Sequence, residues 1–89
     1  MPPSFEEERV TLPDDVALHA RPAAEFVRTA MGFQSRIQVV VGDRESDAKS
    51  LMGVLALGAT GGTELRLTAE GEDAPSALRA LIGCVTAFA

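Results

Sequence analysis

The chain has 89 residues, of which 46% are hydrophobic and 24% are charged, and its formal net charge at pH 7 is −5. This size and apolar content exclude a disordered chain and predict a single domain over residues 1–89. The acidic charge and the absence of Trp and Tyr argue against nucleic acid as a partner, which needs a basic surface and stacking platforms. No apolar run approaches the roughly 18 residues of a membrane span and no signal sequence is recognisable, so we expect no membrane insertion and a cytoplasmic location.

The first half of the chain predicts one helix between strands. A strand is expected over Glu6 to Leu12, where residues of one parity share a face. Apolar residues recur at intervals of three and four from Ala20 to Met31, which predicts an amphipathic helix. Two further strands, Arg36 to Val41 and Arg44 to Ala48, are joined by the turn Gly42-Asp43. The expected inward face of the helix consists of Ala23, Phe26, Val27, Ala30 and Met31.

The second half predicts a short helix, a strand and a final helix. A helix of one or two turns follows Ser50 and ends at Gly58, and alternating residues predict a strand over Glu64 to Glu70. Asp73 and Pro75 are the expected cap and first turn of the last helix, in whose apolar pattern Cys84 is expected as a buried core thiol. Helices covering one face of an antiparallel sheet predict a two-layer α+β domain.

The only histidine, His19, directly precedes the predicted start of the first helix. Pro22 suits the first turn, where backbone N–H groups have no partner within the helix. The free N–H groups at Ala20 and Arg21, the helix dipole and the Arg21 guanidinium predict a site for an anion beside the imidazole. A nucleophilic nitrogen next to an anion site can accept and hold a phosphoryl group. The alternative is a surface or capping role for His19.

A lone histidine also limits the other chemistry that the chain can be expected to perform. Zinc sites usually assemble three or four ligands, and Cys84 is distant from His19 in the sequence, so no metal and no cofactor are expected. No acidic residue adjacent in the sequence supports the imidazole as in a catalytic triad. A carrier needs only the nucleophile and charge compensation, so we expect a phosphoryl carrier and not an enzyme.

Three blocks of the sequence resemble the histidine-containing phosphocarrier (HPr) family of the bacterial phosphoenolpyruvate-dependent sugar phosphotransferase system. Residues 18–24, Leu-His-Ala-Arg-Pro-Ala-Ala, are similar to the phosphorylation motif of that family. Residues 48–54, Ala-Lys-Ser-Leu-Met-Gly-Val, are similar to its regulatory-serine block, and residues 67–74 to the turn into its last helix. The resemblance implies an open-faced βαββαβα sandwich, which is a four-stranded antiparallel sheet with the helices on one face. The element order predicted from the residues agrees with it.

The same resemblance implies a pathway for the phosphoryl group. His19 would accept it on Nδ1 from the phosphohistidine of enzyme I and pass it to a histidine of sugar-specific enzyme IIA domains. Arg21 matches the arginine that compensates the charge of the phosphate. The protein would thus be a carrier within a transferase system, because donor and acceptor proteins supply the rest of the chemistry. We expect it to be a monomer.

Ser50 has a structural and a functional interpretation. A serine before an apolar helical run is a common N-cap, which contributes about 1 kcal/mol. The resemblance implies phosphorylation of Ser50, with an HPr kinase/phosphorylase and a transcriptional regulator as further candidate partners. Phosphate would add nearly two negative charges at the start of the short helix.

The short helix is also the expected docking surface. Leu51, Met52 and Leu55 form an apolar cluster whose ordinary role is in the core, but so short a helix cannot bury every apolar residue. We expect Leu51 and Met52 to be partly exposed and the cluster to dock partners. Arg28 and Lys49 would add a local basic rim that steers acidic partner surfaces.

Val16-Ala17 departs from the family pattern, which has a small polar residue and a glycine before the Leu-His pair. If that glycine supplies a positive φ, Ala17 bears strain of order 1 kcal/mol or the loop takes another course. Two other functions stay open on the sequence. One is a nitrogen-type paralogue with a regulatory role, and the other is a regulatory binding module controlled through Ser50.

Overall fold

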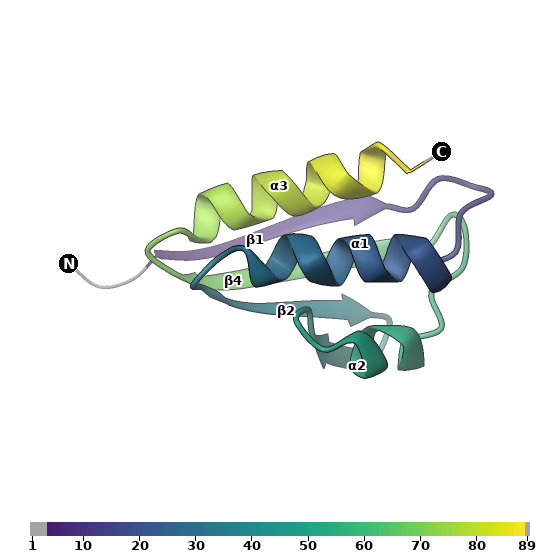
Figure 1. Ribbon diagram of the computed structural model, residues 1–89, viewed down its shortest axis with the longest axis horizontal. Helices are drawn as coiled ribbons and strands as arrows, with labels where there is room; N and C mark the ends of the chain where they lie inside the picture. The colour runs from purple at the N-terminus through teal and green to yellow at the C-terminus, as the bar shows by residue number, and fades with distance from the viewer. Residues whose placement is uncertain (1–3, 89) are drawn as a thin grey trace.

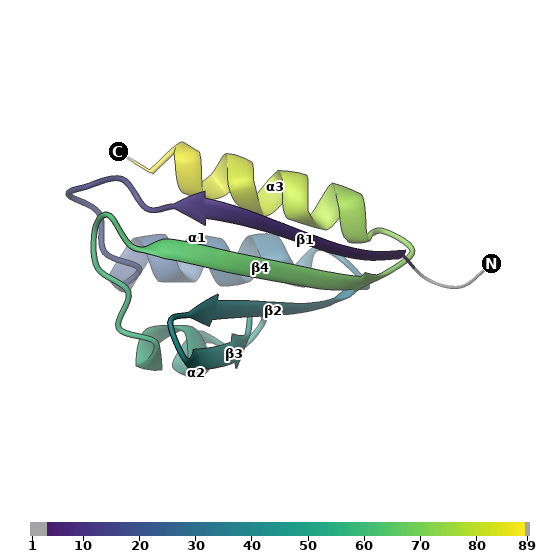
Figure 2. The same ribbon diagram turned by 180° about the vertical axis from the view of Figure 1, so that it is seen from behind.

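The computed structural model describes residues 4–88 as one sheet covered on one face by helices (Figure 1). The sheet is antiparallel and four-stranded, with strand order β1-β4-β2-β3. Its other face is open (Figure 2). The predicted α+β sandwich is thereby confirmed. In chain order the elements are β1 (Ser4–Thr11), α1 (Ala20–Met31), β2 (Arg36–Val41), β3 (Arg44–Asp47), α2 (Leu51–Ala56), β4 (Glu64–Gly71) and α3 (Ala74–Thr86).

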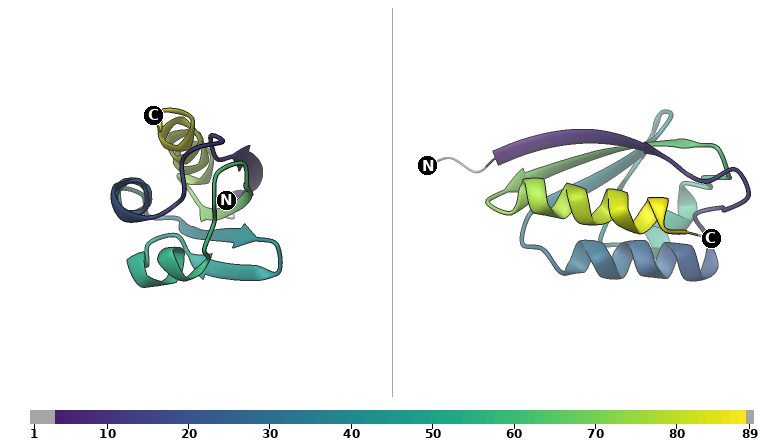
Figure 3. Two further views of the ribbon diagram at one scale, coloured as in Figure 1. Left: turned by 90° about the vertical axis from the view of Figure 1, so that its right-hand side faces the viewer. Right: turned by 90° about the horizontal axis from the view of Figure 1, so that it is seen from above.

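The core lies between the sheet and the helices. Alternation along β4 turns Leu65, Leu67 and Ala69 inward, where all three are buried. Phe26 of α1 is fully buried in this core. Helices α1 and α3 run antiparallel side by side over the sheet (Figure 3). No helix within residues 4–88 is long and apolar enough to cross a membrane.

The prediction that Met31 faces the core is wrong, because its side chain is 65% exposed. With 3.6 residues per turn, Met31 lies at the edge of the stripe that the four buried residues of α1 form. It is also the last residue of the helix, and the chain turns away at Gly32. The buried residues of α1 are Ala23, Phe26, Val27 and Ala30.

Asp73 precedes α3 as predicted, but its side chain does not cap that helix. Its carboxylate instead accepts hydrogen bonds from the backbone N–H of Gln34 at 2.8 Å, the backbone N–H of Ser35 at 2.9 Å and the Ser35 hydroxyl. The turn before α3 is therefore bound to the loop between α1 and β2. Gly71 permits this approach, since a Cβ there would lie only 2.8 Å from the Cα of Ser35.

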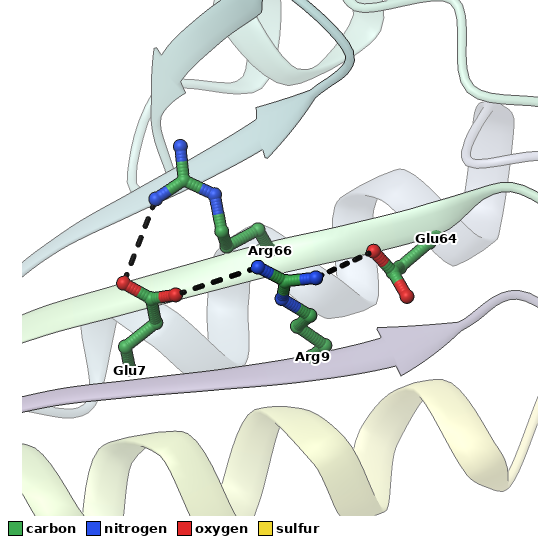
Figure 4. Close-up of polar contacts among 4 residues, drawn as sticks. All are labelled: Glu7, Arg9, Glu64 and Arg66. Atoms are coloured by element: carbon green, nitrogen blue, oxygen red, sulfur yellow. Dashed lines mark ion pairs between the residues drawn. The ribbon is translucent and has the colours of Figure 1, made fainter.

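The open face of the sheet carries a chain of exposed ion pairs (Figure 4). Arg9 and Arg66 are opposite one another across β1 and β4. Glu7 contacts both guanidinium groups, at 4.0 Å to Arg9 and 3.5 Å to Arg66, and Glu64 lies 3.6 Å from Arg9. The two carboxylates thus offset the repulsion between two like charges that the strand register places together.

Candidate functional site

His19 is the N-cap residue of α1 and lies on the surface. Its backbone is extended, with φ −147° and ψ 161°, and its side chain forms no capping hydrogen bond. Leu18, which precedes it, is buried and donates its backbone N–H to the carbonyl of Ala59 at 2.9 Å. The buried leucine fixes the chain while the imidazole stays outside, where another protein can reach it.

The start of α1 provides donors for an anion beside His19. The N–H groups of Ala20 and Arg21 belong to the first turn, which leaves such groups without partners within the helix. The first turn holds no acidic residue, so no carboxylate of that turn competes for these donors. Arg21 is exposed and lines a groove that passes the helix start. The predicted anion-binding residues are therefore together at one helix end. That groove is lined by Ala20, Arg21, Pro22, Glu25, Ala87 and Phe88.

Backbone strain is present near His19, and of the two alternatives expected at Ala17, strain or another course of the loop, the second holds. Ala20 has φ +51° and is the only non-glycine residue with a positive φ in the described part of the chain. Ala17 is not in that region, and its carbonyl accepts a hydrogen bond from the N–H of His19 at 2.9 Å. The loop therefore takes another course past Ala17, and the reversal into the helix occurs directly after His19.

Ser50 caps α2 as predicted. Its side-chain oxygen accepts a hydrogen bond from the N–H of Gly53 at 3.1 Å. A Cβ at position 53 would lie 3.2 Å from the Ser50 Oγ and would collide with the Oγ of Ser46. The glycine therefore allows both hydroxyls to approach the first turn of α2.

Helix α2 presents exposed apolar side chains to the solvent. Met52 is 77% exposed and Leu51 is 42% exposed, whereas Leu55 is half-buried and packs against the core. Helix α2 contacts α1 and lies beside its N-terminal half (Figure 1). The expected exposure of Leu51 and Met52 is confirmed.

Arg28 and Lys49 have different neighbours in the structure. The Lys49 ammonium donates to the carbonyl of Phe33 at 2.7 Å, so Lys49 joins the start of α2 to the loop after α1. Arg28 is exposed and lines a groove between α1 and α3. Steering of acidic partner surfaces by these two cations stays a prediction.

The prediction that Cys84 is a buried core thiol is wrong. Its side chain is half-buried and lines the same groove as Arg28. The residue lies at the edge of the apolar stripe of α3 that Leu78, Leu81 and Val85 define. Partial burial raises the pKa of the thiol, against a smaller lowering by a hydrogen bond with Thr29.

Within residues 4–88 no group of three or more His, Cys, Asp or Glu residues is placed to hold a metal ion.

The sequence reasoning did not identify the support of the His19 loop. The segment 59–63, between α2 and β4, receives the N–H of Leu18 at Ala59 and the N–H of Leu12 at Thr63, each at 2.9 Å. Both segments lie at the end of the molecule where α1 begins (Figures 1 and 2). The glycine pair at 61–62 is the signal for this contact in the sequence, since paired glycines mark a turn and allow close approach of another backbone.

Residues 6–87 of the chain match the model of the PTS-HPr family, which is described as the PTS HPr component phosphorylation site. The chain is 41% identical over 75 residues to the phosphocarrier protein HPr of Xylella fastidiosa strain Temecula1, which covers 84% of each chain. It is 50% identical over 64 residues to a multiphosphoryl transfer protein of Xanthomonas campestris pv. campestris. That match covers 72% of this chain and 8% of the relative's length.

Solved structures agree with the sequence matches. The crystal structure of HPr-C-His from Thermoanaerobacter tengcongensis superposes with a TM-score of 0.87 at 40% identity, covering 91% of each chain. An HPr dimer from the same organism matches with a TM-score of 0.74 at 40% identity, covering 86% of this chain and 88% of that chain. These likenesses extend the agreement from single motifs to the whole sandwich.

Proposed function

This chain belongs to the PTS-HPr family of phosphocarriers of the phosphotransferase system, and on that premise we propose that His19 is its phosphorylated residue. The observation that supports the proposal is the placement of an exposed imidazole directly before the first turn of α1, with Arg21 in that turn. The donor is the phosphohistidine of enzyme I and the acceptor is a histidine of an enzyme IIA domain.

Transfer is a displacement at phosphorus. The lone pair of the His19 Nδ1 attacks the phosphorus, a new N–P bond forms, and the N–P bond of the donor histidine breaks with its electron pair returning to the donor imidazole. Nδ1 must therefore be unprotonated, with the ring proton on Nε2. The reverse roles apply when His19 gives the group to its acceptor.

The helix end supplies charge compensation without enclosing the phosphate. The N–H groups of the first turn and the Arg21 guanidinium favour a dianion beside His19. Because Arg21 is solvent-exposed, its contribution is screened and modest. This suits a carrier, since a closed and tightly binding site would retain the phosphoryl group.

The exposed part of α2 is the proposed docking surface for both partners. Leu51 and Met52 leave an exposed apolar surface on α2, the helix that lies beside the N-terminal half of α1 (Figure 1), and Leu55 supports it from the core side. A Met52→Ser variant should raise the KM of the carrier with enzyme I by severalfold and leave its stability unchanged, because the side chain is 77% exposed. An unchanged KM would contradict this docking role. Arg28 and Lys49, the expected basic rim, would steer acidic partner surfaces toward this docking surface.

Ser50 is the proposed regulatory site. Its Oγ already accepts the N–H of Gly53, so phosphorylation by an HPr kinase/phosphorylase would add nearly two negative charges at the start of α2, directly before Leu51 and Met52 in the chain. The added charge would weaken the docking of partners that bind the uncharged apolar surface of Leu51 and Met52. It would also create a site for a transcriptional regulator that recognises the phosphorylated form. Mass spectrometry after incubation with such a kinase and ATP locates the phosphate, and an unmodified Ser50 would oppose the proposal.

Labelling tests the carrier function directly. The protein is incubated with enzyme I and labelled phosphoenolpyruvate, and the expected label is labile in acid and stable in alkali, as a phosphohistidine is. His19→Ala should abolish labelling with the fold intact, and Arg21→Ala should slow it. Undiminished labelling of His19→Ala would overturn the proposal.

Two simpler properties accompany the carrier role. We propose that residues 1–89 form a single domain and that the protein acts as a monomer, since the proposed docking surface needs α2 and the His19 loop of one chain only. Light scattering at the concentrations of the transfer assay tests the second point. A dimer, as in the Thermoanaerobacter tengcongensis structure, would contradict it.

A further inference from the structure

The segment 59–63 is bonded to both ends of the loop that leads to His19. At one end Leu12 donates its N–H to the carbonyl of Thr63 at 2.9 Å and accepts from the N–H of Gly62 at 3.1 Å. At the other end Leu18 donates to the carbonyl of Ala59 at 2.9 Å. The next residue is His19, so the course of this segment determines where the imidazole stands.

Gly61 lies where the two segments come closest. A Cβ added at this position would overlap the carbonyl group of Asp14 and would lie 3.0 Å from the carbonyl oxygen of Pro13. These are backbone atoms, so no side-chain rotation can relieve the overlap. A side chain at position 61 must therefore displace either the backbone at Pro13 and Asp14 or its own turn until the atoms reach an ordinary contact distance.

Gly62, its neighbour in the same turn, has the opposite properties. A Cβ there would meet only the Asp14 side-chain Oδ1, at an ordinary 3.7 Å. Its backbone has φ +82°, so a side chain at Gly62 causes conformational strain without pushing on the His19 loop. The two glycines therefore separate a steric role from a conformational one.

We propose that Gly61 is a positioning residue for phosphoryl transfer at His19. The inference rests on the proposed function of His19. In this role Gly61 acts through the loop and not by its own contact with the phosphate or the partner. Its missing side chain lets the 59–63 segment hold the loop so that Leu18 is buried and His19 projects at the start of α1. Displacement of a reacting group by about 1 Å can reduce a rate by about 100-fold, so a small shift of this loop is sufficient to matter.

The test compares Gly61→Ala with Gly62→Ala, both in a Gly83→Ala background. Gly83 is an exposed helical residue whose added Cβ meets no neighbour, so this substitution supports the fold without approaching the site. Enzyme I transfers phosphate to each variant while kcat and KM for the carrier are measured. Heteronuclear spectra record the His19 imidazole signals and the hydrogen exchange of the Leu18 amide.

For Gly61→Ala we expect kcat to fall by about 10- to 100-fold with KM within about twofold, because α2 and its docking side chains are unchanged. The His19 signals should shift and the Leu18 amide should exchange faster. Gly62→Ala should lower the Tm by about 4–8 °C and leave kcat and the His19 signals near those of the background protein.

Equal kcat values for Gly61→Ala and the background protein would overturn the proposal, as would equal losses in the two variants. The spectra and the exchange of Leu18 do not depend on enzyme I. If the background protein accepts no phosphate, the proposed function fails, and an unshifted His19 in Gly61→Ala then decides separately against the positioning role. If Gly61→Ala does not fold even in this background, the glycine is required for folding and the positioning role is rejected.

Discussion

Asp73 and Ser35, 38 residues apart in the sequence, are joined by two hydrogen bonds, one to the backbone N–H at 2.9 Å and one to the hydroxyl of Ser35. Ser35 is the one buried polar residue of the described chain, at 1% exposure. The pair connects the loop after α1 with the turn before α3, and so ties both long helices at the end of the sheet remote from His19.

The hydrogen bonds to Asp73 should make stability depend on acid. The bond from the Ser35 hydroxyl, with those from the Gln34 and Ser35 N–H groups, lowers the pKa of Asp73 below 3.8 against the opposing effect of burial. A depressed carboxyl pKa stabilises the fold fully above the unfolded pKa, and this contribution is lost as pH falls through the folded pKa. In urea unfolding between pH 2 and 7, Asp73→Asn should be less stable than the native chain above about pH 5.

The difference between the native chain and Asp73→Asn should shrink below pH 3.8 as the native carboxylate is protonated. Glu72→Gln is the matched control, since it neutralises the adjacent exposed carboxylate. A stability difference that does not vary with pH would contradict the assigned role of the Asp73 charge.

Replacing the strained residue at the site should stabilise the protein. Ala20 has φ +51°, a conformation that costs an L-residue about 1–2 kcal/mol and glycine almost nothing. After the greater chain entropy of unfolded glycine is subtracted, Ala20→Gly should raise the free energy of unfolding by roughly 0.5–1 kcal/mol. Ala17→Gly, where φ is not positive, should lower it. Chemical denaturation of both variants measures the contrast, and a loss of stability in both would refute it.

The cap at Ser50 should have a measurable energetic effect that does not depend on regulation. Ser50→Ala removes the acceptor of the Gly53 N–H and should cost about 1 kcal/mol, whereas Ser50→Asp keeps an acceptor at the same position and should cost less. Thermal unfolding gives the order native, Asp, Ala. In the transfer assay, Ser50→Asp should reduce the rate with enzyme I more than Ser50→Ala, because only the former adds charge beside Leu51 and Met52. The reverse order of rates would argue against electrostatic regulation at this site.

The ion pairs on the open face should contribute little, and only at low salt. Glu7→Gln removes the carboxylate that contacts both Arg9 and Arg66, leaving two opposed cations with Glu64 alone. Because all four side chains are at least 40% exposed, the loss should be about 1 kcal/mol or less at low ionic strength and should nearly vanish in 1 M NaCl. Glu45→Gln on the same sheet is the control, since Glu45 forms no ion pair within residues 4–88. A loss that persists in high salt would indicate a packing role for Glu7 instead.

Periodicity in the sequence predicted the local structure well. The bounds of α1 and β2 agree with the prediction, and the alternation along β4 selects the three residues that are buried. These patterns are readable because they repeat along the chain with the geometry of a single helix or strand. The candidate site is readable in the same way, because His19, Arg21 and the helix start lie within three residues of one another.

What only the tertiary structure decided is which distant backbones touch. It places Asp73 against Ser35 instead of at the cap of α3, leaves Met31 and part of Cys84 exposed at helix edges, and brings Gly61 against Asp14. Local periodicity carries no information on such contacts, because they depend on how helices and loops settle against one another after the sheet forms. The sequence by itself thus determined the elements and the chemistry of the His19 motif. The packing of two separate loops decided how that motif is held.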